Sequence, residues 1–191
     1  MFQNDINLRF RGFFNEATTE FGIAVPNLAE AEDPEDSGQK AVNYRTEPLW
    51  KRMQHAPDEP FSLTDDFQDW WDVLSNTKVG GEPVTPIFQA APGTKVRFRV
   101  LMPGGHSRNL VFALHGHEWD REPYINNSTR LGQNGFSFWE GARMGHGPTN
   151  HFDVLLRYGA GGAFSVPGDY LFRDQVGTGL DAGIWGLFRV Q

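Results

Sequence analysis

The second half of the chain is a succession of short apolar segments separated by glycine and proline. Val96, Phe98 and Val100 alternate with Arg97 and Arg99, and successive side chains of a strand point to opposite faces. This alternation predicts a half-buried antiparallel strand. Because further apolar runs follow at short intervals, the pattern predicts an all-β sandwich or barrel. The other runs lie at 85–90, 109–119, 151–159, 168–175 and 183–191.

Residues 1–82 have a different character and predict an extended arm. Residues 41–60 hold three prolines and isolated large apolar residues such as Leu49. Such a segment is too polar to form a core of its own, so we expect it to lie across another surface. Residues 64–75 predict one short helix that begins with aspartates.

Charge and cysteine content exclude several classes of function. The formal net charge of −7 and the lack of a basic stripe argue against a nucleic-acid partner, because phosphate binding needs clustered Lys and Arg. The chain has no cysteine, which excludes disulfides, thiolate metal sites and any type 1 copper centre. Its start lacks the apolar core of a signal peptide, and no stretch is long and apolar enough to predict a membrane span.

Two stretches of the second half resemble the cupredoxin domain of the large bacterial multicopper oxidases, of the manganese-oxidase type. They read TPIFQAAPGTKVRFRVLMPGGHSRNLVFALHGHEW and VPGDYLFRDQVGTGLDAGIWGLFRV. The resemblance implies a cupredoxin-like antiparallel Greek-key β-sandwich over residues 83–191, with residues 1–82 as the extended N-terminal arm. It also implies copper as the cofactor and an extracellular or periplasmic location.

The resemblance places the copper ligands of the first stretch at residues 110–117. The family pattern there is His-Pro-x-His-Leu-His-Gly-His. This chain has Leu110 at the type 1 ligand position and Ala113 at the type 2 ligand position, so only His115 falls on a ligand position. His117 matches a histidine of the family that usually binds no metal.

The second stretch departs from the family pattern in the same way. Arg173, Asp174 and Gln175 stand where the family has His-Cys-His. An arginine cannot replace a ligand, because its guanidinium stays protonated and offers no lone pair. We expect Arg173 and Asp174 to form an ion pair in the volume of the lost ligands. The ligand set is therefore degenerate, and the chain alone is expected to be inactive as an oxidase.

The histidines allow a second interpretation. His115 and His117 are two residues apart, so in a strand they would share a face and chelate one ion. Together with Glu122 and His151 they resemble the metal motif of the cupins, another β-sandwich class. The alternative is that both histidines only make hydrogen bonds within a tight loop.

The sequence thus predicts a domain or subunit of a multicopper oxidase-like assembly. Its role would be structural, with His115 as the one ligand it contributes to copper shared with another domain. Its partners would be other cupredoxin domains or subunits of the same oxidase. The alternatives are a metal-binding protein with a site built on His115 and His117, and a metal-free binding module.

Overall fold

Strands dominate the part of the chain that the structure describes. The computed structural model describes residues 47, 49–54, 73–75, 77, 80–101, 110–147, 150–175, 180 and 183–191. The strands in these ranges are β1 (Ile87–Ala90), β2 (Arg97–Leu101), β3 (Leu110–Leu114), β4 (Trp119–Asp120), β5 (Trp139–Glu140), β6 (Ala142–His146), β7 (His151–Leu155), β8 (Gly168–Asp174) and β9 (Trp185–Val190). The described helices are α3 (Leu49–Arg52) and the 3-10 turns η2 (Ile125–Asn127) and η3 (Gly162–Phe164). Among these residues no helix has the length and apolar character that crossing a membrane requires.

The described strands form three sheets, of which two pack face to face and the third is the pair β4-β5. The larger sheet has the order β1-β9-β8-β3-β6, and a smaller sheet pairs β2 with β7. The consecutive strands β6, β7 and β8 cross from one sheet to the other and back, as strands do in Greek-key sandwiches. The expected all-β sandwich is therefore confirmed. One pair differs from the antiparallel expectation, because β1 runs parallel to β9.

In the structure, every apolar run for which the sequence predicts a strand does contain a strand. In β2 the alternation holds as expected: Val100 is buried, and Arg97 and Arg99 are exposed. The sequence did not predict β4, β5 or β6. Two of these, β4 and β5, are only two residues long, which is too short for alternation to be visible.

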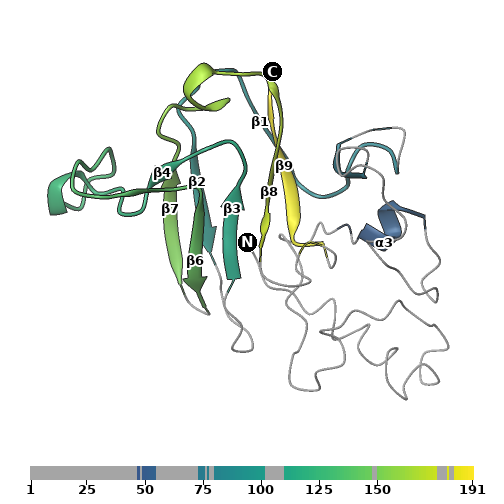
Figure 1. The fold of residues 1–191 in the computed structure, drawn as a ribbon, viewed down its shortest axis with the longest axis horizontal. Coiled ribbons are helices and arrows are strands. Elements are labelled where there is room, and N and C mark those ends of the chain that lie inside the picture. Colours follow the sequence, from purple (N-terminus) through teal and green to yellow (C-terminus); the bar gives the residue numbers. More distant parts are fainter. Residues whose placement is uncertain are drawn as a thin grey trace, which may run out of the picture.

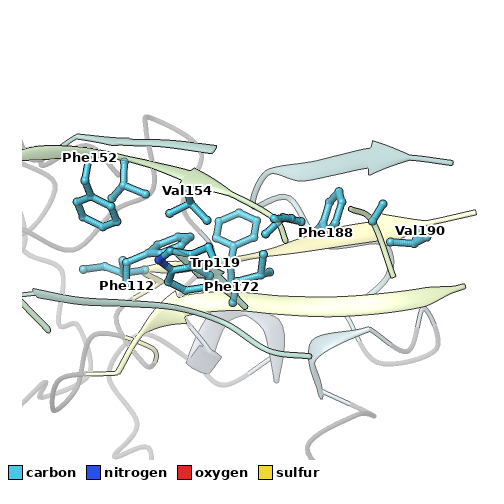
Figure 2. Close-up of a cluster of buried hydrophobic side chains, with 12 residues drawn as sticks. Phe112, Trp119, Phe152, Val154, Phe172, Phe188 and Val190 are labelled. Carbon is cyan, nitrogen blue, oxygen red and sulfur yellow. The ribbon is translucent and has the colours of Figure 1, made fainter. Parts of the chain in front are cut away.

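The main hydrophobic core lies between the two sheets (Figure 2). Aromatic rings join the sheets by edge-to-face contacts, a favoured arrangement for such pairs. Phe98 of β2 meets Phe188 of β9 with ring centroids 5.4 Å apart, and Phe112 of β3 meets Phe152 of β7 at 6.2 Å. The buried members are Val100, Phe112, Leu114, Trp119, Phe152, Val154, Leu156, Ala160, Phe172, Ile184, Phe188 and Val190.

A second hydrophobic cluster covers the outer face of the larger sheet. Figure 1 shows α3 on the side of β8 and β9 that faces away from β2 and β7. Leu49 of α3 is fully buried there. Val73 and Leu74 are helical and join the same cluster, while residues 64–72 of the predicted helix lie outside the described residues. The buried members are Leu49, Val73, Leu74, Leu180, Trp185 and Leu187.

Arg52 ties the second cluster together. Its guanidinium donates from Nη1 to the Glu47 carboxylate at 3.4 Å, from Nη2 to the Gly81 carbonyl at 3.0 Å, and from Nε to the Val73 carbonyl. It also lies over the ring of Trp185, whose indole N–H donates to the Glu47 carbonyl at 2.8 Å. Burial lowers the pKa of Arg52, and the Glu47 carboxylate partly offsets this effect. Each of these hydrogen bonds pairs a polar group that would otherwise cost free energy of folding if it were buried without a partner.

Gly186 provides a test of the packing between β8 and β9. It is paired with Phe172, and a Cβ at this position would lie against the Phe172 ring and 2.6 Å from the Pro86 carbonyl oxygen. We predict that Gly186→Ala lowers the free energy of unfolding by about 1–3 kcal/mol, the usual cost of overpacking a core. Gly135→Ala is the control, because a Cβ there meets nothing within 4 Å. Equal stability of the two variants in urea titrations would contradict this packing.

Leu49 tests the attachment of α3 to the sheet. Leu49→Ala is predicted to lower the free energy of unfolding by about 2–5 kcal/mol, because it empties a fully buried site. We expect one cooperative unfolding transition, and it should shift as a whole when followed by tryptophan fluorescence and by circular dichroism. If the change left stability unaltered, or moved only one of the two signals, α3 would not be part of the same cooperative unit.

Candidate functional site

A tight turn at the end of β3 separates His115 from His117. The strand ends at Leu114, and the next residue already belongs to the turn. Gly116 has a φ of +69°, and a Cβ at this position would lie 2.8 Å from the ring of Tyr170. Both the left-handed backbone and the close approach therefore require glycine here. Because the two histidines do not lie in a strand, the expectation that they share a strand face is wrong.

His117 is buried, and both nitrogens of its ring have hydrogen-bond partners. The Gly161 N–H donates to Nε2 at 3.0 Å, so Nε2 carries no proton. Nδ1 lies 3.0 Å from the carbonyl oxygen of His115, which can only accept, so Nδ1 carries the proton. Burial lowers the pKa of His117, and the bond to His115 partly offsets this. The interpretation as a hydrogen-bonded histidine in a tight loop is confirmed for His117. The lone pair on its Nε2 accepts the bond from Gly161, so it is not available to a metal ion.

His115 is exposed and lines a pocket on the outer face of the larger sheet. Partial burial of its ring and the charge of the neighbouring Arg173 lower the pKa of His115. The imidazole is therefore neutral at neutral pH. The pocket has a volume of about 540 Å³. Its walls are made by Leu74, Ser75, His115, Asp169, Tyr170, Leu171, Arg173, Leu180 and Leu187.

Arg173 and Asp174 do not form the ion pair that the sequence predicts. Adjacent residues of a strand point to opposite faces, and these two follow that rule on β8. Arg173 lines the pocket, whereas Asp174 is buried and accepts from the Val111 N–H at 2.9 Å. None of the ion pairs between described residues joins them. The Arg173 Nε is buried and has no hydrogen-bond partner.

The strands of the two resembling stretches lie side by side. β3 pairs with β8 in antiparallel register, and Ala113 is directly opposite Arg173. Ala113 is buried, and the next residue but one along the chain is His115. The two positions at which the resemblance implies ligands are thus neighbours, and they carry a methyl group and a guanidinium. Neither group can coordinate a metal ion.

The structure does not bring the four candidate metal ligands together. Glu122 is exposed, and its carboxylate lies 3.7 Å from the Arg143 guanidinium. His151 is exposed at the start of β7. Within the described ranges there is no group of three or more His, Asp or Glu side chains that could hold a metal ion. Metal binding by His115, or by any of the other three, stays a prediction.

The pocket includes two features that sequence reasoning missed. Leu74 contributes to its wall from a segment about a hundred residues before β8 in the chain. Asp169 also lines it, and Arg189 holds this carboxylate by two bonds, from Nε at 2.7 Å and from Nη2 at 2.9 Å. A signal for Asp169 was present, because residues 169, 171 and 173 alternate along one strand and therefore share a face. No pattern links Leu74 to that strand.

Solved structures similar to this chain include several copper proteins. A Cu-containing nitrite reductase from Thermus scotoductus is 18% identical with a TM-score of 0.41, over 55% of this chain and 22% of that chain. A laccase from Botrytis aclada is 19% identical with a TM-score of 0.41, over 69% of this chain and 22% of the laccase. A multicopper oxidase from Campylobacter jejuni is 13% identical with a TM-score of 0.40, over 54% and 20% of the two chains.

This chain spans at most 22% of the length of those three proteins. At such identities and TM-scores the likeness assigns no role to any residue. No protein-family model matches the sequence, and no curated protein matches it either.

The hydrogen bonds of His117 predict a loss of stability in acid. Burial holds the pKa of His117 below its ordinary value, so between that lowered pKa and about 6.5 the unfolded chain binds a proton that the folded chain does not. The free energy of unfolding should therefore fall as the pH decreases from about 7 to 5. His117→Phe should be less stable at neutral pH but show a smaller dependence on pH, measured by urea unfolding. His151→Gln, at an exposed site, is the control, and an unchanged pH dependence in His117→Phe would contradict the assignment.

Proposed function

We propose that this chain is a cupredoxin-like module of a multicopper oxidase-like assembly, in which it has a structural role and lacks a complete copper site of its own. Copper, in such an assembly, supplies one-electron transfer and the reduction of oxygen. The residues present at the corresponding place in this chain do not fit a copper ion. Catalysis would therefore belong to the assembly, with other cupredoxin domains or subunits as partners.

The observation that carries the proposal is the pairing of Ala113 with Arg173 beside His115. Copper sites of this kind need ligands from two neighbouring strands, and β3 and β8 are neighbours in this chain. At this place the chain offers only the imidazole of His115 among its described residues, whereas a copper ion needs several ligands. A single histidine holds a copper ion only weakly, because tight sites use three or four ligands.

The charge of Arg173 further disfavours a metal ion at His115. The guanidinium is close enough to His115 to contribute to the lowering of its pKa, which means that it opposes a positive charge on that ring. The Arg173 guanidinium would also repel a divalent cation bound to this imidazole, and the repulsion would be stronger because the ion carries two charges. His115 can serve as a ligand only if a partner supplies further ligands and neutralises Arg173.

Exposed aromatic side chains beside β5 support a role at an interface. Phe136 is 83% exposed, Phe138 59% and Trp139 52%. Aromatic side chains and arginine are enriched at protein interfaces, and Arg157 lies against the face of Trp139. A surface of this composition suits contact with another domain.

Copper loading tests the proposed function. We expect the purified chain to retain less than stoichiometric copper after loading and desalting, measured by mass spectrometry of the metal, and to oxidise neither phenols nor Mn²⁺. Arg173→His should bind copper more tightly than the native chain, because it replaces the repelling cation by a second imidazole in the pocket of His115.

Two outcomes would contradict the proposal. Stoichiometric copper in the native chain, lost in His115→Ala and in His117→Ala, would support the alternative of a metal-binding protein with its own site. Oxidase activity of the isolated chain would overturn the structural role. Arg99→His, on an exposed side chain of β2, is the matched control for the added imidazole.

A further inference from the structure

We propose that the pocket at His115 and Arg173 binds a small organic carboxylate with an apolar body. This inference goes beyond the module role, because it concerns a ligand of the isolated chain and needs no copper. The pocket lies over β8 and β9, and its volume of about 540 Å³ falls within the range of small-molecule sites. The argument rests on the charges and on the apolar surface of its walls.

The charge of Arg173 is not neutralised by the described residues that line the pocket. Asp169, the one carboxylate among them, is already bound by Arg189 through two hydrogen bonds of 2.7 and 2.9 Å. Asp174, the neighbour in sequence, is buried on the opposite face of β8. No ion pair between described residues therefore neutralises Arg173, although Arg189 binds both Asp169 and Glu82, and the guanidinium of Arg173 attracts an anion.

Arg173 also offers unused hydrogen-bond capacity. Its Nε atom is buried and has no partner, although a buried donor left unpaired costs free energy. A guanidinium presents its donors in a planar fork that matches the two oxygens of a carboxylate. His115 lines the same pocket, and its ring nitrogens add hydrogen-bonding capacity there.

The apolar part of the lining selects among anions. The pocket is also lined by Leu74, Leu171, Leu180 and Leu187, and apolar surface gains from contact with an apolar ligand. Inorganic phosphate or sulfate would leave this surface in contact with water. A compact carboxylate with a ring or a short alkyl chain satisfies both the cation and the leucines.

Binding of benzoate to the full chain tests the inference. We expect benzoate to bind in the millimolar range, with benzamide, its neutral counterpart, binding about 10- to 100-fold more weakly because it forms no charge-assisted bonds. Inorganic phosphate should bind more weakly than benzoate. The measurement is a chemical-shift titration, in which the resonances of residues lining the pocket should move.

Substitutions locate the site and separate binding from folding. Arg173→Gln should weaken benzoate about 10- to 100-fold, while Arg173→Lys, which keeps the charge, should retain part of the affinity. Arg99→Gln, on the other sheet with its side chain 75% exposed, should leave it unchanged. The spectra of each variant report folding directly.

Several results would overturn the inference. These are no benzoate binding by the folded native chain, equal binding of benzoate and benzamide, or full affinity in a folded Arg173→Gln variant. If Arg173→Gln does not fold, the inference is tested by comparing the affinities of benzoate and benzamide for the native chain. Copper loading is measured separately, so failure of the carboxylate site and failure of the proposed function are distinguishable.

Discussion

Strand β9 is buried on both faces, and the arrangement of the whole described chain follows from that constraint. Phe188 and Val190 enter the core between the sheets, and Trp185 and Leu187 enter the outer cluster. A strand that is apolar on both faces must be covered on both, or a large apolar surface is left in water. The smaller sheet covers one face, and residues before β1 cover the other. The described residues Leu49, Val73 and Leu74 are therefore part of the packing of the sandwich.

The outer cover also creates the pocket. Leu74 and Leu180 lie against β9, and the space beside them on β8 is open where His115 and Arg173 line it. The candidate site is thus on the outer face of the larger sheet. That location explains why Arg173 can remain charged within a strand whose next residue, Asp174, is buried.

Much of the fold could be predicted from the sequence, because strands with alternating or continuous apolar residues carry their own signal. The runs that became β2 and β9 are examples. Contacts between segments far apart in the chain carry no such signal, and the burial of Arg52 under Trp185 could not be foreseen. Alternation also fails to predict the His115-Gly116-His117 turn. The strand ends at Leu114, and the left-handed turn at Gly116 sends the two rings to different environments.

The candidate site was predicted in part. The resemblance indicated the two strands that carry it, and their residues 113 and 173 are paired. It did not indicate that Arg173 and Asp174 point to opposite faces, although the alternation of a strand implies this. The cupin-like set does not come together among the described residues, and both ring nitrogens of His117 are engaged, by Gly161 and by the carbonyl of His115.

The central claim is that Arg173 places a positive charge beside His115 in the pocket. The pKa of His115, followed by NMR titration in the native chain and in Arg173→Gln, tests this claim most directly. Burial and the Arg173 charge hold the pKa of His115 below its ordinary value, so removal of the charge should raise it while the effect of burial remains. A pKa that is the same in both proteins would mean that the two side chains do not share the pocket, and the account would be wrong.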